Sequence, residues 1–94
     1  MTDRWIKDPD ATLDWAIDWT AWLATDETIA TSTWTVPDGL TQGTGTQAAS
    51  SVDGINTIWL SGGTDGDTYH ITNEIVTSSN RTDDRSFDIT IRER

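Results

Sequence analysis

The chain has 94 residues, six of them tryptophan and none of them cysteine, and its 16 acidic and 6 basic residues give a net charge of −10 at pH 7. This composition excludes disulfides and thiolate metal sites, and so acidic a surface repels the phosphates of nucleic acids, so we expect no direct nucleic-acid binding. The tryptophans supply much of the apolar bulk that a domain of this size can bury.

The first ten residues, MTDRWIKDPD, are charged and lack the apolar stretch of a secretory signal. No segment approaches the roughly 20 apolar residues that span a bilayer. We therefore expect a soluble protein made in the cytoplasm, with residues 1–10 as an extended N-terminal arm and residues 11–94 as a single domain. Trp5 and Ile6 stand out in the arm because they are an apolar pair among charges.

A first strand is predicted at residues 13–19. Apolar residues occupy the odd positions of this segment and small or polar residues occupy the even ones, which is the period of a strand with one buried face. This pattern assigns Trp15 and Trp19 to the core. Trp22 lies where the alternation breaks, so the pattern leaves its environment open.

The second strand is predicted at residues 28–36, because Pro37, Asp38 and Gly39 form a turn signal after it. Trp34 lies on one face of this strand and Ile29 on the other, which suggests a β-bulge. Residues 40–54 contain almost no large apolar side chains. We expect a loop there, with at most one short edge strand.

Three further strands are predicted at residues 55–60, 68–77 and 85–93, with Gly/Asp-rich or polar turns between them. In the last of them the apolar residues again fall on one face: Phe87, Ile89 and Ile91. Short strands separated by turn signals are typical of an all-β fold. The prediction is a small immunoglobulin-like Greek-key β-sandwich.

The sequence offers little for catalysis or for a cofactor. His70 is the only histidine, and the alternation of its strand places it on the solvent side. No nucleophile stands beside a base in a recognisable motif, so we predict that the protein is not an enzyme. The acidic pairs at residues 8 and 10 and at residues 65 and 67 are better explained as turn formers than as a Ca²⁺ site, and no metal or cofactor is predicted.

Several tryptophans on a sandwich also suggest a carbohydrate-binding module, because indole rings stack on sugar faces. The core interpretation is favoured here, since most of the rings share a strand face with aliphatic residues. The residues that fit this interpretation least are predicted to contact partners or other subunits, together with the basic C-terminal end: Trp5, Ile6, Trp22, Arg92 and Arg94.

Two parts of the chain resemble a family of small virion proteins of tailed phages, the fibre-tail adaptor proteins. The resembling parts are residues 7–40 and 57–94, and the specific pieces are KDPDATLD, STWTVPDGL, WLSGGT and RTDDRS. The resemblance implies an immunoglobulin-like sandwich without enzymatic activity. It also implies a place in the virion, in several symmetric copies at the neck or tail, where the protein links tail, collar or fibre components.

Two alternatives remain open from the sequence. A capsid decoration or cement protein, which would contact the major capsid protein on the phage head, also has the properties of a small β-sandwich without catalytic residues. A carbohydrate-binding module is the alternative outside the virion.

Overall fold

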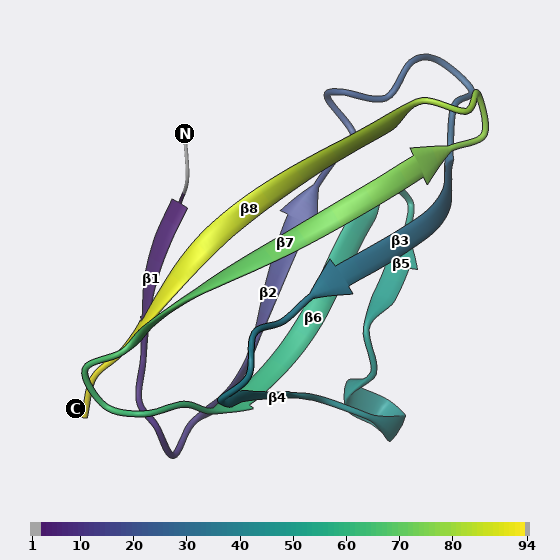
Figure 1. The fold of residues 1–94 in the computed structure, drawn as a ribbon. Coiled ribbons are helices and arrows are strands. Elements are labelled where there is room, and N and C mark those ends of the chain that lie inside the picture. Colours follow the sequence, from purple (N-terminus) through teal and green to yellow (C-terminus); the bar gives the residue numbers. More distant parts are fainter. Residues whose placement is uncertain (1–2, 94) are drawn as a thin grey trace.

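Eight β-strands and one short 3₁₀ helix make up residues 3–93, the part of the chain that the computed structural model describes (Figure 1). The elements in chain order are β1 (Asp3–Lys7), β2 (Thr12–Asp18), β3 (Ile29–Thr35), β4 (Leu40–Gln42), η1 (Gly45–Gln47), β5 (Ser50–Val52), β6 (Ile55–Gly62), β7 (Thr68–Thr77) and β8 (Thr82–Ile91).

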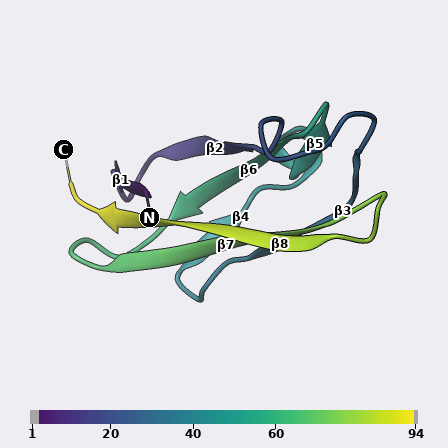
Figure 2. The same ribbon diagram turned by 90° about the horizontal axis from the view of Figure 1, so that it is seen from above.

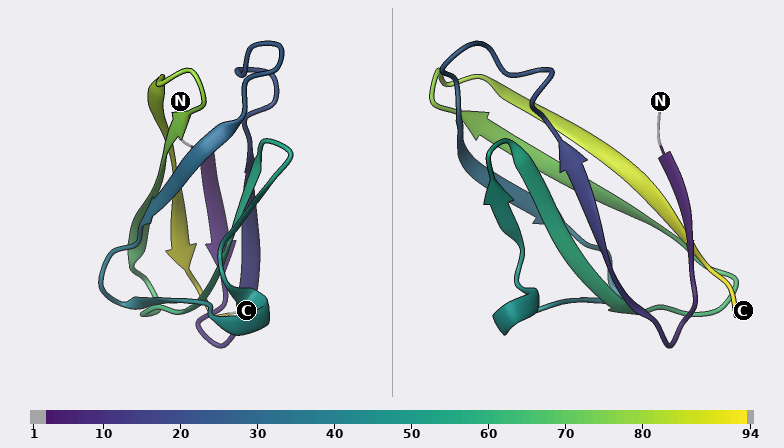
Figure 3. Two further views of the ribbon diagram at one scale, coloured as in Figure 1. Left: turned by 90° about the vertical axis from the view of Figure 1, so that its right-hand side faces the viewer. Right: turned by 180° about the vertical axis from the view of Figure 1, so that it is seen from behind.

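The strands form two sheets that pack face to face (Figure 2). One sheet has the order β1-β8-β7-β3, in which β1 runs parallel to β8 and the other pairs are antiparallel. The other sheet has the order β2-β6-β4, and β5 also pairs with β6. Seen from behind, β2 and β6 lie in front of β7 and β8 (Figure 3). The all-β, two-layered fold class is confirmed, and the immunoglobulin-like Greek-key type stays a prediction.

Alternation along the strands places the core where the sequence predicted it. On β7 and β8 the odd-numbered residues from Tyr69 to Ile75 and from Phe87 to Ile91 are buried, whereas His70 is exposed. Trp15 lies against the core and stacks on Phe87, with a ring separation of 6.2 Å. The assignment of Trp15 and Trp19 to the interior is therefore confirmed.

A buried polar network joins the two sheets near the end of β2. Asn73 on β7 accepts hydrogen bonds from the indole N–H of Trp19, at 3.0 Å, and from the amide of Asn56 on β6, at 2.8 Å. The Asn73 amide donates to Ser32 Oγ and to the carbonyl of Thr33 on β3. Because all three central side chains are fully buried, these bonds fix how the sheets lie on each other.

Two segments differ from the sequence prediction. Residues 40–54 contain two short strands, β4 and β5, where at most one was expected, because both pair through the backbone with the long strand β6 and need few apolar side chains. The last strand begins at Thr82, three residues earlier than expected, since its polar start pairs with the end of β7. The predicted bulge in β3 is confirmed as a register shift between Ile29 and Thr31.

Candidate functional site

An apolar groove opens along one side of the sandwich, where β1 and β2 form the neighbouring edges of the two sheets. We call it the edge groove. It has a volume of about 320 Å³ and is lined by Trp5, Ile6, Leu13, Asp14, Trp15 and Ala16. Three of these side chains are unusually exposed for large apolar residues: Trp5 at 50%, Ile6 at 52% and Leu13 at 42%.

The register of β1 explains why Trp5 reaches this groove. Trp5 pairs with Ile89 and Lys7 pairs with Ile91, so both project from the sheet on the same side as the core residues of β8. Ile6 lies on the opposite face of the strand. Part of the segment expected to be an extended arm is thus a sheet strand, and Trp5 lies over the gap between the two layers.

Lys7 is the last residue of β1 and follows the groove residues Trp5 and Ile6 in the chain. Its side chain is fully buried, and its ammonium donates to the carbonyls of Asp8, at 2.8 Å, and of Gly62 on β6, at 2.7 Å. Burial lowers the pKa of Lys7, while the carboxylates of Asp8 and Asp10 oppose that shift. Lys7 therefore ties β1 to the opposite sheet, a role that no sequence pattern indicated.

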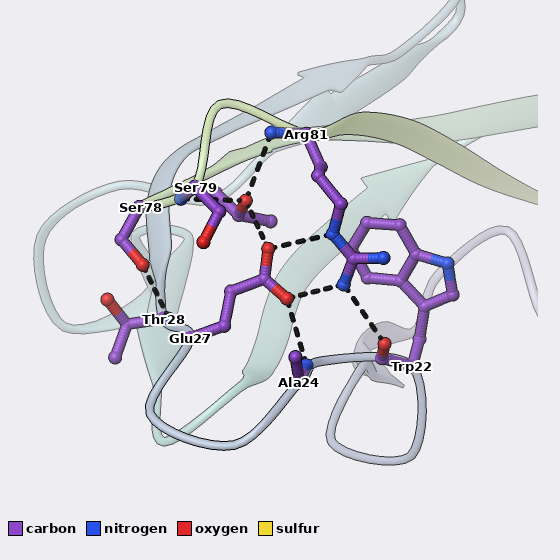
Figure 4. Close-up of polar contacts among 8 residues, drawn as sticks. Trp22, Ala24, Glu27, Thr28, Ser78, Ser79 and Arg81 are labelled. Carbon is purple, nitrogen blue, oxygen red and sulfur yellow. Dashed lines mark hydrogen bonds and ion pairs between the residues drawn. The ribbon is translucent and has the colours of Figure 1, made fainter.

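Trp22 lies at the far end of the sandwich, in the loop between β2 and β3 (Figure 4). Its ring is half-buried, meets Trp19 edge to face at 5.5 Å, and carries the Arg81 guanidinium 4.0 Å above its centre. Arg85 stacks in the same way on Trp19, at 4.3 Å. The break in alternation at Trp22 thus reflects a loop residue held by cation–π and ring contacts.

Glu27 holds this loop to the turn between β7 and β8. Its buried carboxylate accepts hydrogen bonds from Nε and Nη2 of Arg81, from the hydroxyl of Thr77 and from the backbone N–H of Ala24 (Figure 4). The bond from Arg81, followed by those from Thr77 and Ala24, lowers the pKa of Glu27 to about 2. We call the Glu27–Arg81–Trp22 group the loop clasp.

A second depression, of about 420 Å³, lies beside the loop clasp. It is formed by the β2–β3 loop and the β5–β6 turn, with Leu23, Glu27, Ile29 and Asp53 among its lining residues. Asp53 has a left-handed backbone, with φ of 52°. The surface at this end of the molecule has both polar and apolar side chains, and Glu27 anchors it to the β7–β8 turn through its hydrogen bonds.

The basic residues predicted at the C-terminal end do not gather into one described site. Arg92 is exposed directly after β8, and its backbone N–H donates to the carbonyl of Lys7 at 2.9 Å. Arg92 thus lies close to the end of β1. The loop between β2 and β3, which contains Trp22, lies at the opposite end of the sandwich (Figure 1). Arg94 lies outside the described residues.

The histidine and the aspartates considered above as catalytic or metal-binding candidates make local hydrogen bonds. His70 Nδ1 lies 2.7 Å from Asp88 on the outer face of the sheet. Asp8 accepts a bond from the backbone N–H of Asp10, and Asp65 accepts one from that of Glu93. Within residues 3–93, no three metal-binding side chains come together.

The comparison with known families gives the chain its context. A family model described as "Podophage GP4 fiber-tail adaptor protein gp77" matches residues 7–90. The chain belongs to this family. The matched segment begins at the end of β1 and includes every strand from β2 to β7 and most of β8. No curated protein matches the chain. In its described part there is no helix with the length and apolar character needed to cross a membrane.

Proposed function

We propose that this protein is a non-enzymatic component of the phage virion that links tail and fibre components. The observation that carries the proposal is the family match over residues 7–90. Two features at different places on the sandwich, the edge groove and the loop clasp, support it as candidate contact surfaces. The edge groove and the loop clasp lie well apart along a body whose longest extent is 43 Å.

In this proposal the protein occupies the neck or tail in several symmetric copies, after synthesis in the host cytoplasm. Trp5 and Ile6 contact a neighbour at the edge groove, and Arg92 lies next to the same edge. Trp22 contributes to the surface at the loop clasp. We propose that Arg94, like Arg92, contacts a partner or another subunit.

The exposure of the tryptophans does not favour the carbohydrate-binding alternative. Stacking on sugars needs two or more accessible rings on one polar face. Trp5 is the one exposed ring, while Trp15 and Trp19 are buried and the other three are half-buried.

Imaging of purified particles tests the proposed function. The protein, labelled at an exposed position such as Thr46 of η1, is expected at the junction between tail and fibres. Particles assembled without it are expected to have complete heads and to lack attached fibres. A label on the head surface would instead support the decoration alternative, and full fibre attachment without the protein would refute the linking role.

A further inference from the structure

The edge strands of the two sheets differ in how they are protected against pairing with another strand. Natural proteins protect an edge by keeping it short, by bulges, by prolines or by inward-pointing charges. β4 and β5 have three residues each, β3 has a bulge after Ile29, and β1 carries the inward-pointing Lys7. β2 has none of these features, and its protection is limited to two exposed carboxylates, Asp14 and Asp18.

β2 is a regular edge of seven residues that hydrogen-bonds only to β6 in its sheet. Its register runs without a shift from Thr12, opposite Ser61, to Asp18, opposite Ile55. It contains no proline and no lysine. The carbonyl of Asp18 accepts a hydrogen bond from Arg85 Nη1 at 3.0 Å, so the last residue of the edge is partly occupied. Before that residue, the far side of β2 presents backbone groups in the arrangement that an added strand requires.

We propose that an extended segment of a tail or fibre protein adds as a strand to the free edge of β2. Its apolar side chains enter the edge groove, and its alternate, basic side chains lie opposite Asp14 and Asp18. The proposal rests on the proposed function for the origin of the segment. It goes beyond that function by naming the binding mode and the chemistry of the partner.

The edge groove suits one face of such a segment. Side chains of an added strand alternate between the two faces of the sheet. Those on the inner face would meet Leu13 and Trp15 of β2 and the exposed ring of Trp5 across the gap. These groups are apolar, so the inward-facing residues of the partner are aliphatic or aromatic.

The charges on the outer face of β2 determine which side chains the added strand carries on its outer face. Asp14 and Asp18 project from the outer face of β2 and are exposed. Opposite charges on neighbouring strands stabilise a sheet, whereas like charges directly opposite destabilise it. The net charge of −10 adds long-range attraction for a basic segment. The partner therefore alternates apolar residues with lysine or arginine.

A second copy of this chain fits the edge poorly. In a symmetric antiparallel pair of β2 strands centred on Ala16, Asp14 of one copy would lie opposite Asp18 of the other, which places like charges together. Trp5, Ile6 and Leu13 together expose on the order of 300 Å² of apolar surface, so most of the roughly 800 Å² of total surface per partner in a stable dimer would have to come from the acidic surroundings. A single strand gains affinity from backbone hydrogen bonds instead.

Binding of synthetic peptides to the full chain tests the proposal. The first peptide alternates valine with lysine, the second alternates valine with glutamate, and the third has the composition of the first in shuffled order. We expect the first peptide to perturb the backbone amide signals of residues 12–18 and to bind about tenfold or more tightly than the other two. Equal binding of the first and third peptides, or signals changed elsewhere, would overturn the proposal.

Two substitutions on β2 have matched controls. Leu13→Lys introduces the residue that natural edges use for protection, and Asp14→Lys reverses one of the two selecting charges. Both substitutions are expected to weaken binding of the valine–lysine peptide about tenfold or more. Asp14→Lys is also expected to strengthen binding of the valine–glutamate peptide. Val52→Lys changes another exposed apolar residue, at 62% exposure, and Asp38→Lys another exposed aspartate. The controls should change affinity less than about twofold.

Particles assembled with the same variants separate this inference from the proposed function. With the label at the tail–fibre junction, loss of fibres from Leu13→Lys and Asp14→Lys particles but not from control particles supports strand addition. Full fibre attachment in all four would overturn it while the linking role stands. A label found elsewhere on the particle would refute the proposed function, and with it the assigned origin of the segment. Dimers formed through β2 would also overturn the proposal.

Discussion

Replacement of Asn73 by leucine tests whether the buried polar network stabilises the sandwich. The two side chains have the same branched shape and the same number of heavy atoms, so Asn73→Leu removes hydrogen-bonding groups without opening a cavity. The asparagine accepts two bonds, from Trp19 and Asn56, and donates to β3. After the substitution the Trp19 indole N–H and one Asn56 amide N–H lose these acceptors.

The expected loss of stability follows from those two donors. Each buried neutral group left without a partner costs about 1–3 kcal/mol, and the added apolar surface of leucine recovers part of this, so we expect a net loss of about 2–5 kcal/mol. The total free energy of unfolding of a domain of this size is about 5–15 kcal/mol. Asn73→Leu should therefore remove a measurable share of the stability, and at the lower end of that range it would bring the protein close to unfolding.

Urea unfolding followed by far-ultraviolet circular dichroism measures the effect without relying on the tryptophan signal. Trp19→Phe removes the indole donor, and the double variant should show a coupling energy of about 1 kcal/mol or more. Thr68→Val is the control, because its hydroxyl meets Thr90 on the exposed face and its loss should cost less than about 0.5 kcal/mol. A loss below about 1 kcal/mol for Asn73→Leu would refute the assigned role of the network.

Three further predictions concern the loop clasp and the turns. The pKa of Glu27 is about 2 in the folded protein against an ordinary value of 4.5. Its contribution to the free energy of unfolding is therefore complete above pH 4.5 and is lost as the pH falls toward 2. The urea midpoint should fall over that window, and it should fall less in Glu27→Gln; parallel curves for the two proteins would contradict this. Arg81→Lys keeps the charge but loses the planar fork, and should lower the melting temperature; an unchanged value would show that charge alone suffices. Gly63→Ala should destabilise the protein by about 1–3 kcal/mol more than Gly66→Ala, since both glycines have positive φ but a Cβ at residue 63 would lie 2.7 Å from Ile91; equal losses would contradict the steric argument.

The main strands could be predicted from the sequence because each has one face against the core. On β7, Tyr69 and Ile71 alternate with polar residues, and burial follows that alternation. β4 and β5 could not be predicted in the same way. Their positions are set by backbone bonds to opposite ends of β6, and residues 40–54 have no apolar period that would indicate those bonds.

The candidate site could be predicted only in part. Trp5 and Ile6 were singled out as an apolar pair among charges, and both are exposed beside the edge groove; their contact with a partner stays a prediction. Lys7 was missed because its burial depends on the carbonyl of Gly62, 55 residues away. The surroundings of Trp22 depend in the same way on Arg81, which reaches it from the β7–β8 turn.

An unprotected strand edge carries a risk of aggregation, and the charge distribution indicates how this protein limits it. A net charge of −10 opposes self-association at long range. At short range Asp14 and Asp18 oppose pairing of β2 with its own copy in the register centred on Ala16, although they leave the backbone groups of residues 12–17 available. The same two carboxylates favour a basic strand, so one feature of the edge both limits pairing between copies and selects a partner. Both effects come from the outer face of β2, which makes that face, rather than the tryptophans alone, the place where the specificity of the proposed strand addition should be tested.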